Sequence, residues 1–257
     1  MRATLNEYRK GSNEHGSRVY EVQHVAEFVR LACWLYGTDE VIFRGQKESW
    51  PLLPLVARDA GLVRAEGEML EEFKRAAFPF LDRRELSNWQ WLALAQHCGL
   101  PTRMMDWTKN PLAALWFAVR EPPREQAPGV VWAYSYQSEG IVDSNGKDPF
   151  KISKVLVYFP EHVYRTIQAQ EGVFTVHPRL ERFEQFEALK DADALLTRIE
   201  IPSAAFWHMR YSLYRIGIHD GSLFPGLRGI AGKIKYKHLG LEDDPRPSAA
   251  KRDRSSK

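Results

Sequence analysis

The sequence predicts an α+β fold in a single domain, with helices concentrated in the first half of the chain and strands mostly in the second. Apolar residues recur at helical spacing before about residue 120, whereas short β-branched and aromatic runs dominate after it. No internal repeat or clear linker divides the chain. We therefore expect one domain over residues 18–240, a loose segment over 1–17 and a disordered tail over 241–257.

Composition supports a packed globular protein. The 257 residues are 44% hydrophobic and 12% aromatic, which is enough to bury a large core. Lys and Arg number 36 against 33 Asp and Glu, so the mild basic excess permits a nucleic-acid partner without requiring one. Without a signal peptide or a bilayer-spanning run, we expect a cytoplasmic protein with no membrane partner. Cys33 and Cys98 fall in apolar helical patterns, which predicts reduced thiols packed in the core.

The elements of the first third follow from apolar spacing. A helical pattern starts at Tyr20 and runs to Gly37 as its cap. A short apolar strand, Val41-Ile42-Phe43, follows and ends in Arg44-Gly45-Gln46. A helix from about Ala65 to Leu81 is then expected to turn its apolar side chains inward, namely Met69, Phe73, Ala76 and Ala77.

Residues 89–119 are the most strongly patterned stretch. A first helix has its apolar positions at Trp91, Leu94, Ala95 and Cys98, and it ends at Gly99 and Pro101. A second helix begins with Asn110 as N-cap and Pro111 as its first residue. Between them, a short strand carries polar side chains onto two helix ends. Because helix ends leave backbone N–H and C=O groups free, we interpret residues 100–108 as the floor of a ligand site.

The second half contains most of the predicted strands, at residues 130–134, 154–159, 195–201 and in the C-terminal half of 165–178. Ser203 could cap a helix that continues to Gly217. The last helix places four apolar residues on one face, namely Leu227, Ile230, Ala231 and Ile234.

Three groups of polar residues are candidates for chemistry. Arg44 stands at a strand end beside Gly45, where its guanidinium could grip a phosphate while glycine lets a ligand approach the backbone. The alternative, equally open, is an ion pair between Arg44 and a carboxylate such as Asp106. The second group contains His97, Thr102, Arg103, Asp106, Trp107 and Thr108, in which Arg103 and Asp106 could instead form a buried structural pair. The third contains Gln168, Gln170, Glu171, Phe174 and His177, in which Glu171 could equally be an ordinary exposed residue.

Several familiar signatures are missing. The sequence has no GxGxxG after a strand, no GxxxxGK[ST], no HExxH and no GxSxG. The spacing of Cys and His residues does not predict a metal site.

Four stretches resemble the FRG-domain family of bacterial and phage proteins. They are FRGQKESWPLLPLVAR at 43–58, AQHCGLPTRMMDWTKNPLAALWFAV at 95–119, QEGVFTVHP at 170–178 and GIHDGSLFPGLRGIAGKI at 217–234. In the order of the family, they cover most of the chain from Val41 to Ile234.

Phe43-Arg44-Gly45 also resembles ADP-ribosyltransferases, which clamp NAD with an Arg at the end of an early strand. The resemblance implies a mostly antiparallel split sheet like that of those enzymes. It also implies catalytic roles for Arg44, Thr102 and Glu171. The NAD-binding residues implied are Phe43, Arg44, Gly45, Gln46, His97, Thr102, Arg103, Asp106, Trp107, Thr108, Gln170 and Phe174.

The resulting functional expectation is an NAD-dependent mono-ADP-ribosyltransferase that acts as a toxin or phage-defence effector. The basic excess favours a nucleic-acid acceptor, RNA more than protein, and such an activity would need a neutralising antitoxin. The alternative is a non-catalytic module that binds a nucleotide or nucleic acid. A further alternative is a metal-free nuclease that uses His97 and His177.

Overall fold

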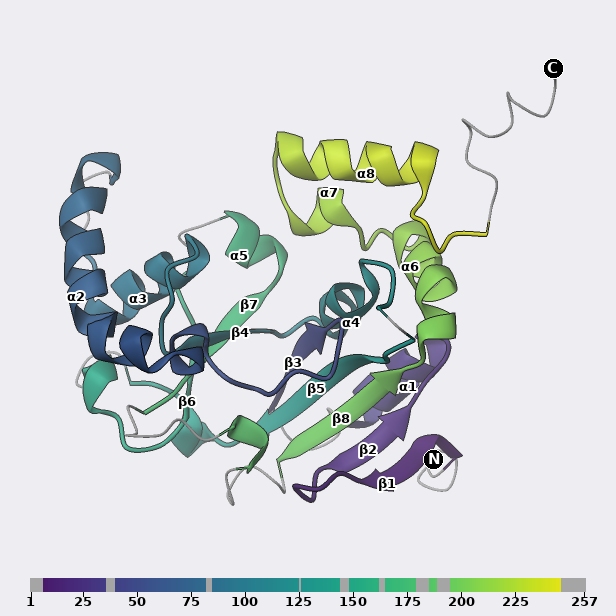
Figure 1. The fold of residues 1–257 in the computed structure, drawn as a ribbon, viewed down its shortest axis with the longest axis horizontal. Coiled ribbons are helices and arrows are strands. Elements are labelled where there is room, and N and C mark those ends of the chain that lie inside the picture. Colours follow the sequence, from purple (N-terminus) through teal and green to yellow (C-terminus); the bar gives the residue numbers. More distant parts are fainter. Residues whose placement is uncertain are drawn as a thin grey trace.

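The protein is described by a computed structural model over residues 7–35, 40–81, 85–124, 126–143, 148–161, 165–178, 185–188 and 195–245. Within these residues the chain builds one eight-stranded sheet in the order β1-β2-β8-β5-β3-β4-β7-β6, running from right to left in Figure 1. The strands are β1 (Arg9–Ser12), β2 (Arg18–Glu21), β3 (Glu40–Gln46), β4 (Met104–Thr108), β5 (Gly129–Tyr136), β6 (Leu156–Tyr158), β7 (Gly172–Val176) and β8 (Leu196–Ile201).

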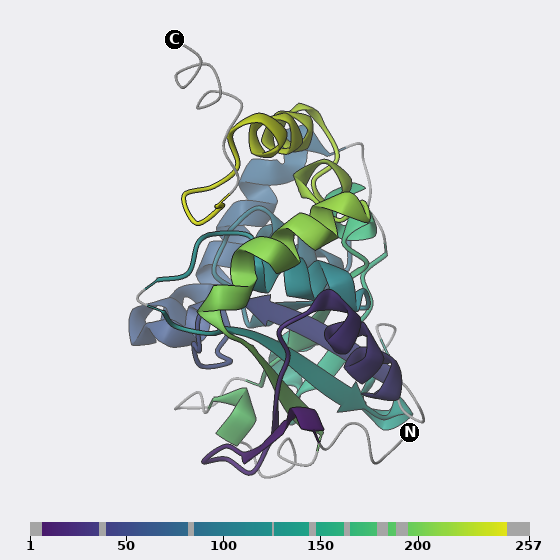
Figure 2. The same cartoon turned by 90° about the vertical axis from the view of Figure 1, so that its right-hand side faces the viewer.

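Helices cover one face of this sheet. They are α1 (Val25–Leu35), α2 (Ala60–Ala77), α3 (Asn88–His97), α4 (Pro111–Val119), α5 (Arg165–Ala169), α6 (Phe206–Arg215), α7 (Asp220–Leu223) and α8 (Leu227–Leu239). The helices α1, α4 and α6 share a core with β2, β3, β5 and β8, whereas α3 and α5 share one with β4, β6 and β7. The opposite face is covered by Leu52 and by the short 3-10 helix Phe186–Ala188. In Figure 2, α6 lies between the sheet and α8. The α+β fold class is thereby confirmed.

The sheet is continuous but nearly divided between β3 and β4. All seven residues of β3 pair with β5, whereas β3 and β4 pair at one position only, Phe43 with Thr108. Among the named strands, only β2 and β8 run parallel. The sheet is mostly antiparallel, as expected, and its two halves form one continuous sheet. The pair of Phe43 and Thr108 joins the two halves, and beyond this pair β3 and β4 separate from each other.

The N-terminal region differs most from its prediction. Part of the expected loose segment is ordered, because Arg9–Ser12 forms β1 and pairs with β2. The expected helix start at Tyr20 is also wrong, since Arg18–Glu21 is a strand that pairs with β8. Tyr and Val suit a strand as well as a helix, and pairing with β8 decides between the two. The predicted cap at Gly37 lies outside the described residues.

The helices around the predicted site mostly begin and end as expected. Asn110 caps α4 by accepting hydrogen bonds from the backbone N–H groups of Leu112 and Ala113, and Gly99 after α3 has a φ of 92°. By contrast, α2 begins before Ala65, because Asp59 caps it at Ala60. That helix buries Glu66 and Leu70 rather than the predicted Met69, Ala76 and Ala77.

Three further expectations need correction. Cys33 and Cys98 are exposed and not core residues, because their helices bury neighbouring positions instead. The strands β1–β4 lie in the first half of the chain, so strands are not concentrated in the second. Most of the predicted tail, residues 246–257, lies outside the described part. No helix in that described part is both long and apolar enough to cross a membrane.

The apolar face of α8 points outward. Leu227, Ile230 and Ile234 are 86%, 50% and 52% exposed, because the helix packs through its opposite, glycine-containing face. At Gly229 an added Cβ would lie 1.9 Å from the carbonyl oxygen of Phe224, so only glycine permits this contact with α7.

Candidate functional site at the opening of the sheet

Arg44 lies where β3 and β4 separate. Its Nη1 donates a hydrogen bond to the backbone oxygen of Asp106 at 2.6 Å, so a side chain bridges strands that no longer share a backbone ladder. The side chain is half-buried, and its buried Nε has no hydrogen-bond partner among the described residues. A buried donor without a partner costs free energy, so this atom is available to an acceptor from a ligand.

The electrostatics at Arg44 favour an anion. Burial lowers the pKa of Arg44, the Asp106 carboxylate opposes that shift, and the Arg58 guanidinium adds to it. Arg58 ends the 3-10 helix Leu55–Arg58 and is exposed. Two neighbouring guanidinium groups repel each other, and an oxyanion between them would relieve that repulsion.

Asp106 is held at this opening by a short hydrogen-bonded chain. Gln96, near the end of α3, donates from Nε2 to Oδ2 of Asp106 at 2.9 Å and accepts from the Thr102 hydroxyl at 2.8 Å. Thr102 Oγ1 also accepts from the backbone N–H of Met104 at 3.1 Å. The chain therefore orients an exposed carboxylate. Thr102 is itself buried and acts through Gln96 rather than by touching a ligand.

His97 ends α3 on the same side as Asp106. Partial burial lowers its pKa, and the Asp106 carboxylate opposes the shift, so the imidazole is neutral near pH 7. The ring is exposed. The structure thus gathers four predicted site residues around the opening, namely Arg44, His97, Thr102 and Asp106.

Glu171 lies elsewhere. Its backbone oxygen accepts from Lys109, beyond the far end of β4, and its carboxylate accepts from Asn110 Nδ2 at 3.2 Å. Thr102 precedes the near end of β4, so a rise of about 3.4 Å per residue separates Thr102 and Glu171 by about 20 Å. The predicted trio of Arg44, Thr102 and Glu171 does not converge. The carboxylate that acts electrostatically on Arg44 is that of Asp106.

Thr108 and Gln170 belong to the Glu171 end. The Thr108 hydroxyl donates to the backbone oxygen of Gln170 and accepts from the backbone of Asn110. Gln170 Nε2 donates to the Leu223 oxygen at 3.0 Å, which ties this turn to α7. Glu171 itself is exposed with a φ of 47°, a conformation that is uncommon outside glycine.

Several predicted NAD-binding residues are core residues instead. Phe43, Trp107 and Phe174 are buried in three different hydrophobic clusters and present no ring face to a ligand. Gln46 is buried and accepts from Trp132 Nε1 at 3.1 Å. A Cβ on Gly45 would lie 1.8 Å from the Ala114 oxygen. Glycine at this position therefore serves the contact of β3 with α4, and not the approach of a ligand.

Arg103 is a structural residue whose partner is Glu66 and not the Asp106 that the sequence suggested. Its guanidinium and its backbone N–H both bind Glu66 of α2, with an Nη2–Oε2 distance of 2.7 Å, and both side chains are buried. The alternative pair with Asp106 is wrong. This contact fixes α2 to the residue before β4, the strand that forms one side of the opening.

His177 is buried beneath the same region. Its Nε2 lies 3.0 Å from the Thr175 hydroxyl, which accepts from Trp107 Nε1 at 2.8 Å. Burial, followed by the charges of Arg44 and Arg103, lowers the pKa of His177 to about 3. A neutral, buried imidazole cannot serve as a nuclease acid, so the nuclease alternative loses one of its two histidines.

Sequence reasoning missed Gln96, Arg58 and Glu66. Gln96 was detectable from its place beside His97 in the last turn of a helix that ends at the site. Arg58 and Glu66 carry no local signal, because both lie in ordinary charged segments. No cluster of three or more His, Cys, Asp and Glu side chains occurs among the described residues.

Residues 39–127 match the family model of the FRG domain. No curated protein and no solved structure matches the chain. The matched span begins before β3 and ends after α4, so it contains every residue gathered at the opening. The segment that builds this site therefore matches the FRG domain.

Proposed function

We propose that this protein is an NAD-dependent mono-ADP-ribosyltransferase whose site is the opening between β3 and β4. The observation that carries the proposal is the Arg44 guanidinium, held by the Asp106 backbone oxygen with its buried Nε unpartnered beside Arg58. Such a pair of guanidinium groups suits the diphosphate of a dinucleotide.

The carboxylate of Asp106 supplies the second requirement of this chemistry. Cleavage of the bond between nicotinamide and ribose develops positive charge on the sugar, and a fixed carboxylate stabilises that charge. The acceptor then bonds to the same sugar carbon and releases a proton. Gln96 and Thr102 orient Asp106 for this role. In this proposal Asp106 replaces Glu171 as the carboxylate that stabilises the charge on the sugar.

The acceptor that we favour is nucleic acid, with RNA ahead of protein, because the chain carries a net charge of +3. Modified RNA would harm the cell that makes the enzyme. The proposal therefore extends to a toxin or phage-defence effector that an antitoxin protein restrains. Induced expression should stop growth for the wild-type chain and not for Arg44→Lys at equal protein level.

The decisive experiment measures NAD binding by calorimetry and nicotinamide release in the presence of total RNA, DNA or lysate protein. Arg44→Lys keeps the charge but loses the planar fork, and Asp106→Asn loses the carboxylate. Both should reduce release at least about 100-fold, since each removes charge stabilisation from the transition state. Glu171→Gln and the exposed control Arg64→Lys should retain release.

The outcomes separate the candidate functions. Saturable NAD binding without release for any acceptor would leave the non-catalytic nucleotide-binding module as the function. The absence of NAD binding by folded wild-type protein would reject both the transferase and an NAD-binding module. Loss of release in Glu171→Gln alone would return the catalytic role to Glu171.

A further inference from the structure

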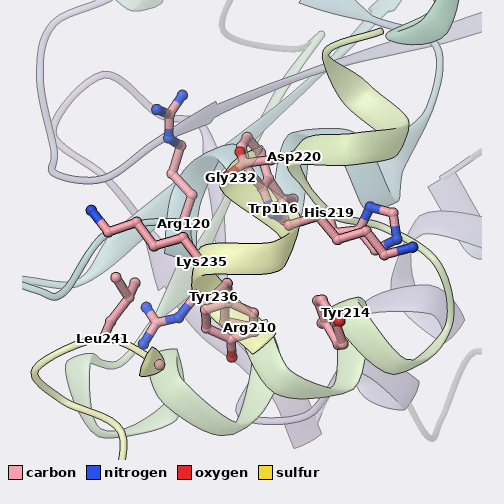
Figure 3. A pocket seen from close by; sticks show the side chains of 12 residues that line it. Trp116, Arg120, Arg210, Tyr214, His219, Asp220, Gly232, Lys235, Tyr236 and Leu241 are labelled. Atoms are coloured by element: carbon pink, nitrogen blue, oxygen red, sulfur yellow. The ribbon is translucent and has the colours of Figure 1, made fainter. Parts of the chain in front are cut away.

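A cavity lies between α4, α6 and α8, on the far side of α4 from the Arg44 side chain. Its volume is about 160 Å³, and Figure 3 shows Arg120, Arg210 and Lys235 around it. Arg44 does not line it. Because β3 turns Gly45 toward α4 and alternate side chains point to opposite faces, Arg44 faces away from this cavity.

The lining is cationic. Arg120, Arg210, Lys233 and Lys235 contribute four positive charges, and Asp220 contributes a carboxylate. Arg210 also pairs with Asp243, and Arg120 lies 3.8 Å from Glu121, so the uncompensated charge comes from the two lysines. Neither lysine forms an ion pair with any residue that the structure describes. His219 adds no compensating negative charge, and burial together with Lys233 lowers its pKa, so its ring is neutral near pH 7.

Arg210 is a buried polar residue in the lining of the cavity. The side chain is 4% exposed and donates to the backbone oxygen of Val119 at 2.8 Å and to the Asp243 carboxylate. Its Nε is buried and has no partner among the described residues. A buried guanidinium with one unused donor is a group that an oxyanion would satisfy.

The aromatic residues of the cavity form walls rather than stacking surfaces. The Arg120 guanidinium lies 5.0 Å from the centre of the buried Trp116 ring. The Tyr214 and Tyr236 rings lie 5.2 Å apart and pack against each other. Since these ring faces are already in contact with protein, the cavity suits a compact anion better than a planar base.

Helix α8 extends the positive charge beyond the cavity. It carries Arg228, Lys233, Lys235 and Lys237 and contains no Asp or Glu. All four of these side chains belong to exposed residues. Since successive residues of a helix turn by about 100°, Arg228 and Lys235 lie on one side of α8, and Lys233 and Lys237 lie on the other. Cations on both sides of one helix can contact more than one phosphate of a nucleic-acid strand.

We propose that this cavity binds a phosphate group of a nucleic-acid strand, RNA or DNA, while α8 contacts neighbouring phosphates. The site supplies binding and not chemistry, and it does not rest on the transfer reaction proposed at Arg44. If both sites operate, this one holds the acceptor strand.

The test is fluorescence anisotropy of a labelled single-stranded RNA and a labelled single-stranded DNA across a range of salt concentrations. The double variant Lys233→Gln/Lys235→Gln should weaken binding about 10-fold or more and reduce the salt slope by about 1 for each lysine. The matched control Lys151→Gln/Lys154→Gln removes two exposed lysines elsewhere and should stay within about 2-fold of wild type. Inorganic pyrophosphate should compete with the strand in the wild type and not in the Lys233/Lys235 variant.

Each result decides the inference. Equal affinity of the Lys233/Lys235 variant and the control variant would overturn it, as would an absence of strand binding by wild-type protein. Binding to vesicles of anionic phospholipid without binding to either strand would assign the cations to a lipid headgroup instead. Arg44→Lys should keep strand affinity, so failure of the transfer reaction can be told apart from failure of this site. Thermal unfolding confirms that each variant is folded.

Discussion

Arg44 and Asp106 hold the two halves of the sheet together where its backbone pairing fails. The Arg44 guanidinium donates to the Asp106 backbone oxygen at 2.6 Å, next to the single backbone pair between β3 and β4. One side chain therefore closes the sheet and offers an unpartnered Nε at its opening. Stability and ligand binding must be separated in any test of this residue.

The first prediction concerns that bond. Arg44→Met should lower the free energy of unfolding by about 1.5–3 kcal/mol, because it leaves a carbonyl without its charged donor. Urea unfolding measures the change. Arg64→Met, at an exposed position of α2, should change stability by less than about 0.5 kcal/mol. Equal effects of the two substitutions would mean that the bond contributes nothing.

Gly45 provides a second prediction. In Gly45→Ala the new Cβ would lie 1.8 Å from the Ala114 oxygen, so α4 must move away from β3. We expect a loss of at least about 3 kcal/mol or failure to fold, since backbone cannot yield as a side chain can. Gly67→Ala in α2 meets no atom within 4 Å and should stabilise the protein by about 0.5–1 kcal/mol. Similar stabilities for the two variants in urea would contradict the packing described.

The buried pair of Arg103 and Glu66 gives a third. Arg103→Met leaves the Glu66 carboxylate buried without its cation and should cost about 3–5 kcal/mol. Adding Glu66→Gln removes the stranded charge and should recover part of that loss. Lys74→Met breaks the exposed pair with Glu71 and should cost less than about 1 kcal/mol. A double variant less stable than Arg103→Met would argue against a stranded charge.

His177 predicts a dependence of stability on pH. Its pKa is lowered from 6.5 to about 3 in the folded protein, so the unfolded chain binds the extra proton first as the pH falls. The stabilisation is complete above pH 6.5 and is lost progressively as the pH falls toward about 3. Urea unfolding between pH 7 and pH 4 should show a smaller fall in stability for His177→Gln than for wild type. The exposed His238→Gln should follow the wild-type curve.

The two exposed cysteines provide a fifth prediction. A thiol reagent should modify both Cys33 and Cys98 in the folded protein, because neither is in the core. Cys98 should react more slowly, since partial burial raises its pKa and reduces its thiolate fraction. If the two thiols react only after unfolding in urea, Cys33 and Cys98 are core residues, as the sequence predicted.

Local sequence was sufficient for the elements that local interactions stabilise. Asn110 and Pro111 begin α4, Gly99 ends the turn after α3, and the apolar run before Arg44 is β3, all as predicted. Caps and helix stops depend on contacts within a few residues, so the pattern contains the necessary information. The same information located Arg44, His97, Thr102 and Asp106 on the segments that meet at the opening.

Partners distant in the sequence were decided only by the tertiary structure. The pairing of β2 with β8 made a strand from residues whose spacing predicted a helix. Arg103 binds Glu66 and not Asp106. The carboxylate whose charge acts on Arg44 is that of Asp106 and not that of Glu171. Sequence by itself determined which segments carry polar side chains to helix and strand ends. Which of those side chains face one another depends on sheet order and register, which arise from long-range pairing and burial of apolar area across the whole chain.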